Sequence, residues 1–493
     1  MKNIILASCL FAATAMSTSC SDFLDVKPTH AADASQSITT AADAGVIIRG
    51  LMSNMANGSY YGRNFPLYGD VKGGDFTIIS QGRGYDYLYV FNHSTNSNNF
   101  SSVWSQGYNC IVQINNLIAQ IEKLKANGST ENFDTYIGQA LTARALIYFD
   151  LVRLYGEPYN EDKNSLGVPI TLEVLNYDAK PARNTVSEVY TQILKDLKDA
   201  EPLLSKTKSN GFINYYANKA IQARVYLYQE DFDNSLTASE EIINSNAYSL
   251  YSNANWVGSW ATQFGSESIF ELAILPSEGD LGNTSLGAYY RRRAHPNTTI
   301  APGYFTASTN FIAKLNEDPT DVRKGIMSYD ETSTTRFGSL YKYSGSTTLN
   351  AAGDGKQSTT AINIKVIRLS EIYLIASEAA LRKSSPNLTK ASEYLNKIRS
   401  RSPQLAATTA TTINLDAIAD ERSKELVGEG HRFFDMMRWN KSITFDDALG
   451  SVTTIHRSGT IDRTFFKTIL PIPLDEINAN PEIKIQQNPG YNQ

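Results

Sequence analysis

Aromatic side chains with a few charged neighbours gather in two segments that have no helical periodicity, 75–89 and 256–292. An aromatic ring is a rigid apolar plate that can stack on a sugar face, while carboxylate and guanidinium groups bond hydroxyls or a ligand carboxylate. Loop segments carry such groups without disturbing the scaffold beneath them. We therefore predict a ligand-binding face with the following candidates: Tyr85, Tyr87, Trp256, Tyr289 and Tyr290 as stacking plates, and Asp75, Arg83 and Arg292 as hydrogen-bonding partners. The alternative for each ring is packing in the core or within a loop.

Three carboxylates near the C-terminus could form the acid and base pair that a glycosidase requires: Glu425, Glu429 and Asp435. Arginines lie among them: Arg422, Arg432 and Arg438. Because charges of opposite sign alternate here, structural ion pairing is the favoured interpretation. The chain has no GxSxG nucleophile motif, and Cys110 lies on an apolar helix face, where a buried thiol is unreactive. These patterns predict a protein that is not an enzyme.

Metal, nucleotide and nucleic-acid sites are not predicted. None of the five histidines has the HExxH spacing or a comparable metal-ligand spacing. The glycine-rich stretches 82–84 and 353–356 lack the spacing and the following Ser or Thr of a phosphate loop. A net charge of -5 provides no field that attracts phosphates. We expect no cofactor, no metal ion and no nucleic-acid partner.

The N-terminus reads as a bacterial lipoprotein signal peptide over residues 1–19. Lys2 supplies the positive charge, residues 4–15 form an apolar run that is too short to span a bilayer, and small residues precede Cys20. A small-residue site that ends in cysteine resembles a lipobox, in which cleavage leaves Cys20 first and its sulfur carries a diacylglycerol. The alternative is an ordinary secretory signal that is cleaved nearby.

Cysteine usage agrees with export without disulfides. Cys9 would leave with the signal and Cys20 would be acylated, so Cys110 has no partner. Acyl chains contribute about 0.8 kcal/mol per buried methylene, and no later stretch of 18 apolar residues follows. We predict a membrane-anchored protein in which residues 20–38 form a tether and residues 39–493 a single folded domain.

Most of that domain has helical periodicity. Apolar positions recur at helical spacing from Val103 to Leu124, from Leu141 to Tyr155, and from Val186 to Leu197. Gly128, Gly156 and Pro202 follow these stretches and mark where they end.

Two segments, 215–245 and 369–398, each predict a pair of antiparallel helices joined by a tight turn. Each pair spans roughly the 34 residues of a tetratricopeptide repeat, in which small residues let paired helices approach closely. The stretch from about 250 to 363 is rich in Gly, Ser, Thr, Asn and Tyr and has little helical periodicity. The fold class predicted is mostly α, with tetratricopeptide-like repeats and a loop-rich insertion that carries short strands and shapes a recognition surface.

Several motifs, in order along the mature chain, resemble the SusD/RagB family of Bacteroidetes outer-membrane lipoproteins. They are the opening Cys20–Pro28, Trp104 with Tyr108 and 111–115, the stretch 144–151 with Tyr155, Gly156 and Pro158, the stretch 421–439, and the C-terminal segment 470–491. The resemblance covers nearly the whole mature chain. Glu157, directly before Pro158, is a small departure from the family pattern.

The resemblance implies a helical fold in which four tetratricopeptide-like units support a loop-rich ligand face. It further implies a cell-surface lid on a TonB-dependent, SusC-like transporter, which binds its ligand without cleaving it. The stretch 429–439 would be structural in such a protein. The ligand face would draw on the segment before the first long helix and on the insertion.

Three functions remain open from the sequence. The first is a receptor for an oligosaccharide or polysaccharide, which aromatic plates beside carboxylates favour. The second is a receptor of the same family for peptides or protein fragments. The third is a glycosidase, which would need two carboxyl groups a few ångströms apart in a cleft.

Overall fold

The computed structural model describes residues 38–82, 84–176, 178–274, 284–290, 303–330, 333–343 and 362–491. The predicted signal peptide and the predicted tether up to residue 37 lie outside these ranges. Ile38, at the end of the predicted tether, is already buried in the core. Within the described ranges, no helix is both long enough and apolar enough to cross a bilayer.

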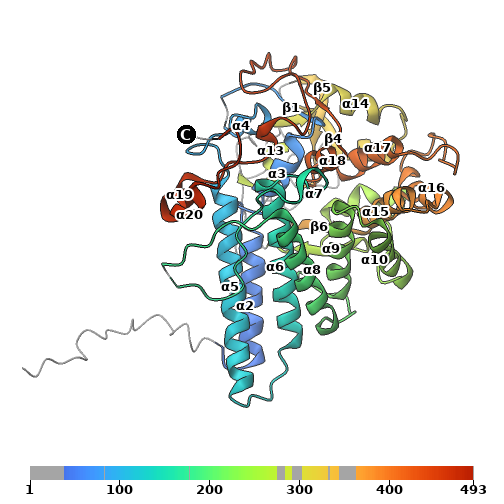
Figure 1. Cartoon of the computed structure of the whole chain (residues 1–493). Helices are drawn as coiled ribbons and strands as arrows, with labels where there is room; N and C mark the ends of the chain where they lie inside the picture. The colour runs from blue at the N-terminus through green and yellow to red at the C-terminus, as the bar shows by residue number, and fades with distance from the viewer. Residues whose placement is uncertain are drawn as a thin grey trace, which may run out of the picture.

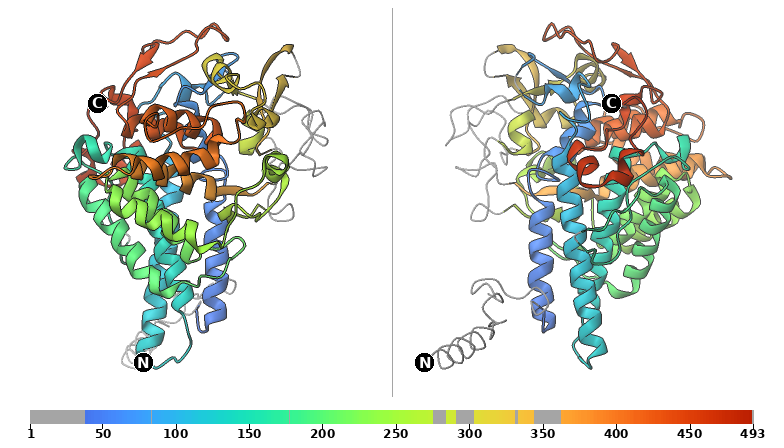
Figure 2. Two further views of the ribbon diagram at one scale, coloured as in Figure 1. Left: turned by 90° about the vertical axis from the view of Figure 1, so that its right-hand side faces the viewer. Right: turned by 60° about the vertical axis from the view of Figure 1, so that its left-hand side comes forward.

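Helices form the bulk of the described chain, as the sequence predicts. Long helices stand side by side on one side of the molecule, and shorter helices pack against them in succession (Figures 1 and 2). The helices of this scaffold are α2 (Ala41–Met55), α5 (Ser101–Ala126), α6 (Asp134–Tyr155), α8 (Val186–Ala200), α9 (Tyr215–Tyr228), α10 (Phe232–Ser245), α15 (Leu369–Arg382), α16 (Leu388–Arg399) and α17 (Leu415–Leu426).

Helix α5 confirms the first predicted helix. Its apolar stripe, which includes Val103, Ile114 and Ile121, is buried against the rest of the scaffold. Lys123 and Lys125 lie in its last turn, where positive charge complements the helix dipole. Gly128 adopts the left-handed conformation just beyond the end of the helix.

Helix α6 is buried on nearly every side, so it forms the centre of the scaffold. It packs against α5, α2 and α8. Its charged side chains are paired: Arg144 binds Asp196 of α8 at 2.7 Å, and Arg153 binds Asp150 at 2.6 Å. The pairing explains how arginine and aspartate are tolerated in a helix without an exposed face.

The two predicted helix pairs are confirmed as α9 with α10 and α15 with α16. In the first pair, the hydroxyl of Ser235 donates to the carbonyl of Ala223 at 2.8 Å across the interface. In the second, the hydroxyl of Ser377 donates to the carbonyl of Ala391 at 2.7 Å. Small residues thus bring the backbones close enough for a side chain of one helix to reach the backbone of the other. The pairs also pack on each other through α10 and α15.

The predicted insertion contains short strands, as expected, and also short helices. Its described elements are α11 (Asn253–Trp256), η4 (Gly258–Ala261), β2 (Ser268–Leu272), α13 (Leu286–Tyr290), β3 (Phe305–Ala307), α14 (Thr309–Leu315), η6 (Val322–Ile326), β4 (Met327–Asp330) and β5 (Ser333–Leu340). Strand β2 pairs antiparallel with β6 (Ile364–Arg368), which leads directly into α15. Both ends of the insertion are therefore held by the scaffold.

A second two-stranded sheet joins the insertion to the segment before the first long helix. Strand β1 (Phe76–Ile78) pairs antiparallel with β3, with Phe76 opposite Ala307 and Ile78 opposite Phe305. Helices α3 (Asn64–Val71) and α4 (Asp86–Tyr89) flank β1 along the chain, and both lie close to it. This pairing brings together the two segments that the sequence analysis assigns to the ligand face.

The remaining described elements are short and lie mainly toward the C-terminus. They are α7 (Tyr159–Asp162), η3 (Glu201–Leu203), α18 (Arg432–Arg438), β7 (Ile443–Thr444), β8 (Thr460–Ile461), η7 (Phe466–Thr468), α19 (Leu474–Ala479) and α20 (Pro481–Lys484). The C-terminal stretch is tied to α6, since the amide of Asn488 donates to the carbonyl of Tyr155 at 2.8 Å.

Candidate functional site: a tyrosine cluster beside the β1–β3 sheet

Three of the predicted plates meet in one place. The rings of Tyr85 and Tyr87 stack with centroids 5.7 Å apart, and Tyr85 meets Tyr289 edge-on at 5.1 Å. Tyr304 adds a further ring 5.0 Å from Tyr289. We call Tyr85, Tyr87, Tyr289 and Tyr304, together with Arg63, the tyrosine cluster.

Arg63 lies between two rings of the cluster. Its guanidinium carbon is 5.0 Å from the centroid of Tyr85 and 5.3 Å from that of Tyr289, within the range of a cation–π contact. Its Nε donates to Asn64 at 2.8 Å, and its Nη1 donates to the carbonyl of Thr284 at 3.0 Å. Two hydrogen bonds hold the group in place, and a guanidinium has five N–H donors, so it can serve further acceptors.

The cluster combines support from below with partial exposure. Tyr85, Tyr87 and Tyr304 are partly exposed, whereas Tyr289 is 6% exposed, so it supports the neighbouring rings and is not the open stacking plate that the sequence predicted. Burial raises the pKa of Tyr289 to about 12, and burial raises the pKa of Tyr87 above its ordinary value. Both phenols stay neutral at physiological pH, so each hydroxyl can donate and accept a hydrogen bond.

Tyr304 and Arg63 are the members that the sequence analysis missed. Tyr304 lies in the insertion, and its aromatic type was the only available signal. Arg63 precedes α3 in a stretch with no motif around it, so nothing in the local sequence marks it. Arg63 comes to lie between the rings of Tyr85 and Tyr289 only when the insertion folds over the segment before the first long helix.

Two of the predicted residues are buried instead of lining the cluster. Tyr290 is 1% exposed, stacks on Phe76 at 4.7 Å and donates its hydroxyl to Asp70 at 3.1 Å. Asp75 is 5% exposed, accepts from the hydroxyl of Ser423 at 2.8 Å and lies 3.3 Å from Nε of Arg432. Both hold β1 to neighbouring elements, so we leave them out of the candidate site.

Trp256 is also a structural residue. Its side chain is completely buried, and its indole N–H donates to Glu425 at 3.2 Å. Its ring contacts Trp260 with centroids 6.0 Å apart. A ring without an exposed face cannot stack on a sugar. The sequence pattern could not show this, because the residues that contact its indole include Lys342, Arg401 and Glu425, which lie far along the chain.

The other predicted site residues, Arg83, Arg292 and the lipidation site Cys20, lie outside the described residues.

The predicted structural role of Asp435 is confirmed. Its carboxylate accepts from Arg422 at 2.9 Å and from Arg438 at 2.9 Å, and all three side chains are buried. Burial alone would raise the pKa of Asp435, but the two guanidinium groups hold it below its usual value. The group is a charged partner in an ion pair and is not placed to shuttle protons.

Glu425 and Glu429 are paired as well, but mainly with residues from outside the local sequence. Arg368 donates to Glu429 at 2.7 and 2.8 Å and to Glu425 at 3.1 Å, and Lys342 donates to Glu429 at 2.6 Å. Burial opposes ionisation of Glu429, yet the charges of Arg368 and Lys342 hold its pKa below the usual value. The predicted ion pairing of Glu425 and Glu429 is confirmed. Their partners are Arg368 and Lys342, however, and not the arginines that lie near them in the sequence.

The thiol of Cys110 is free and buried in α5, as predicted. Burial raises its pKa to about 12, so the thiolate needed for nucleophilic chemistry is not populated at physiological pH. In the described part of the chain, no group of three or more His, Cys, Asp or Glu side chains is arranged to hold a metal ion.

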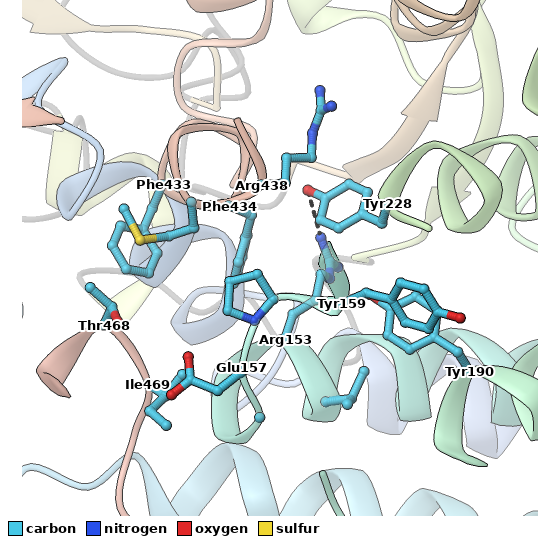
Figure 3. Close-up of a pocket in the computed structure, with 14 residues that line it drawn as sticks. Arg153, Glu157, Tyr159, Tyr190, Tyr228, Phe433, Phe434, Arg438, Thr468 and Ile469 are labelled. Carbon is cyan, nitrogen blue, oxygen red and sulfur yellow. Dashed lines mark hydrogen bonds between the residues drawn. The ribbon is translucent and has the colours of Figure 1, made fainter. Parts of the chain in front are cut away.

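A small cavity lies where the end of α6 meets α7 and α18 (Figure 3). Its volume is about 30 Å³, which holds about two water molecules. Arg153 lines it, with the guanidinium 4.0 Å from the ring centroid of Phe149 and 4.6 Å from that of Phe434. The space is too small for a sugar ring, so we attribute it to packing around a buried arginine.

Comparison with known proteins identifies the family. The sequence model described as the SusD family matches residues 80–491. The chain therefore belongs to the SusD family.

Individual relatives agree with this assignment over nearly the whole length. SusD-like protein P2 from Formosa agariphila is 24% identical over 510 aligned positions, covering 96% of this chain and 97% of the relative. A SusD superfamily protein from Bacteroides thetaiotaomicron has the same fold, with a TM-score of 0.83 and 33% identity over 92% of this chain and all of that one. A protein from Bacteroides vulgatus described as a putative sugar binding protein has a TM-score of 0.81 and 33% identity, covering 92% of this chain and 99% of that one.

Proposed function

We propose that this protein is a cell-surface nutrient receptor that captures an oligosaccharide or polysaccharide and delivers it to a TonB-dependent, SusC-like transporter. The observation that carries the proposal is the tyrosine cluster, in which the partly exposed rings of Tyr85, Tyr87 and Tyr304 lie close to the guanidinium of Arg63 where the segment before α5 meets the insertion. Stacking surfaces with nearby hydrogen-bonding groups suit a pyranose ring. The description of the Bacteroides vulgatus relative as a sugar binding protein supports the same ligand class.

A second candidate is the same receptor role for peptides or protein fragments. Tyrosine rings also bind peptides, so the cluster alone does not distinguish the two. A combined array of oligosaccharides and peptides provides the test. We expect binding signals from glycans, and signals confined to peptides would replace the first candidate by the second.

We further propose that the bound ligand is not cleaved. The carboxylates that could have formed an acid and base pair are buried in ion pairs, and the free thiol is not ionised. Prolonged incubation of the best-binding oligosaccharide with purified protein is expected to return it intact by chromatography. Products that exceed the amount of protein would overturn this part of the proposal.

The membrane anchor is proposed at Cys20, from the apolar run and the small residues before it. Metabolic labelling with an alkynyl fatty acid is expected to mark the wild type and not Cys20→Ala, because only the cysteine sulfur accepts the diacylglycerol. Fractionation of the same cells serves as the control. If Cys20→Ala still partitions with the membranes as the wild type does, another anchor is present. Protease treatment of intact cells tests the outward orientation, and complete resistance would place the protein inside.

A further inference from the structure

Away from the tyrosine cluster, two open hollows meet at Phe466 on the C-terminal segment. One has a volume of about 510 Å³ and is lined by Glu157, by α7, by Ser165, Leu166 and Arg183, and by parts of 463–469 and 487–489. The other has a volume of about 460 Å³ and is lined by 93–96, Phe466, Lys467, Gly490 and Tyr491. Each volume lies within the range of about 300–1,000 Å³ that is typical of ligand sites.

Phe466 lines both hollows, and the residue is 38% exposed. The ring lies edge-on to Tyr491 at 5.2 Å and packs closely on the backbone of Gly490, where an added Cβ would come 2.3 Å from a ring carbon. Gly490 also has a positive φ of 82°, a conformation that glycine adopts without strain. The C-terminal segment thus holds a rigid aromatic plate at the junction of the hollows.

Two charged groups near the plate have no ion-pair partner among the described residues. Glu157 lines the first hollow and forms neither a hydrogen bond nor an ion pair with them. Burial raises the pKa of Glu157, repulsion from Glu161 and Asp162 adds to the effect, and the charge of Arg463 across the same hollow opposes it without forming an ion pair. On the other side, the Lys467 ammonium lies 5.7 Å from the Phe466 ring centroid. A free acceptor and a free donor therefore flank the plate.

From this geometry we infer a second carbohydrate site, in which Phe466 stacks on a sugar ring while Glu157 accepts from its hydroxyls and Lys467 donates to its oxygens. The inference rests on the proposed function as a glycan receptor. An extended peptide is a poorer fit, because none of the residues that line the two hollows belongs to a β-strand whose edge could pair with it.

The second site is separate from the tyrosine cluster but touches it through one buried residue. His93 lines the second hollow, and its ring lies 6.0 Å from that of Tyr87. Ligand binding at the tyrosine cluster can therefore change an NMR signal at the second site through His93. The experiment below distinguishes this transmitted change from binding at the second site itself.

The test follows the methyl signal of Ile469, which lines the first hollow, by NMR of the purified full-length protein. The probes are the pentaoses of laminarin, cellulose, starch, xylan, mannan and polygalacturonic acid. We expect at least one to shift this signal, and we expect Phe466→Ala and Glu157→Gln each to weaken that binding about ten-fold or more, as central contacts do. Ile455→Ala, which removes a side chain that is 82% exposed and lines neither hollow, is expected to change nothing.

Tyr85→Ala separates this inference from the proposed function. If the Ile469 shift persists in Tyr85→Ala and disappears in Phe466→Ala, the second site is independent. If the shift disappears in Tyr85→Ala, it was transmitted from the tyrosine cluster and the second site is refuted. The absence of a shift with every probe also refutes it, whatever the tyrosine cluster binds. Loss of binding in Phe466→Ala could also result from misfolding. Glu157→Gln provides a second test of the same site, because it preserves the shape of the side chain.

Discussion

Tyr85→Ala is expected to weaken binding of the best oligosaccharide by about 2 kcal/mol, a roughly thirty-fold rise in Kd. Tyr85 is the central ring of the cluster, since it contacts Tyr87, Tyr289 and the guanidinium of Arg63. Its loss removes a stacking face and also one of the two rings that contact the guanidinium. Calorimetric titration of the wild type and the variant gives the comparison directly.

Tyr290→Phe is the matched control for this prediction. Tyr290 is next to Tyr289 in sequence, but it is buried and its hydroxyl bonds Asp70. Removing that hydroxyl leaves a buried acceptor with one fewer partner, so the melting temperature should fall while the affinity stays the same. If Tyr85→Ala and Tyr289→Ala both bind the oligosaccharide with wild-type affinity, the tyrosine cluster is not the ligand site. Only the function shared by the family would then stand.

Arg368→Ala is expected to lower the free energy of unfolding by about 3–5 kcal/mol at pH 7. The guanidinium is 3% exposed and bonds three buried carboxylates, those of Glu267, Glu425 and Glu429. Without it, these negative charges remain in a water-poor environment with insufficient compensation. Urea denaturation followed by circular dichroism measures the loss.

Lys195→Ala provides the matched control, because it also removes the cation of an ion pair. Its side chain is 63% exposed and its partner Asp199 is on the surface of α8, so the change should stay within about 0.5 kcal/mol. A loss below about 1 kcal/mol in Arg368→Ala would show that the buried carboxylates find other partners, and the network would then not be a main source of stability.

The same network predicts the direction of the pH dependence. Burial opposes ionisation of Glu425 and Glu429, but the surrounding cations hold the pKa of each below its usual value in the folded state. Their contribution to stability is therefore present above the unfolded pKa, about 4.3, and is lost as the pH falls through the lower folded pKa. In Arg368→Ala the same carboxyls protonate more readily. The difference in stability between wild type and variant should therefore shrink as the solution is made acidic, and a constant difference would contradict this account.

The helical scaffold could be predicted from the sequence because helical periodicity is a local property. Val103 and Ile121 lie on one apolar stripe of α5, and a helix through them buries that stripe. The small residues of the two helix pairs predicted close packing in the same way. Ser235 and Ser377 confirm it, because the hydroxyl of each reaches the backbone of the partner helix.

The candidate site was only partly predictable, because the sequence does not show what covers a ring. Tyr289 and Tyr290 are neighbours of the same type in α13, yet Tyr289 joins the cluster while Tyr290 packs on Phe76. Successive side chains of a helix point in different directions, and only the position of β1 decides which of them faces the core. No motif in the sequence marked Arg63 as a member of the site.

The sequence by itself determined the family, the helical scaffold and the presence of aromatic and charged groups in two segments without helical periodicity. The tertiary structure decided which of those groups can meet a ligand, because the β1–β3 pairing joins segments more than 200 residues apart and buries Asp75 and Tyr290 while leaving Tyr85 partly exposed. Exposure depends on contacts made far along the chain, as the burial of Trp256 against Glu425 of α17 demonstrates. Local patterns cannot encode such contacts, since each one exists only after both segments have folded onto the same scaffold.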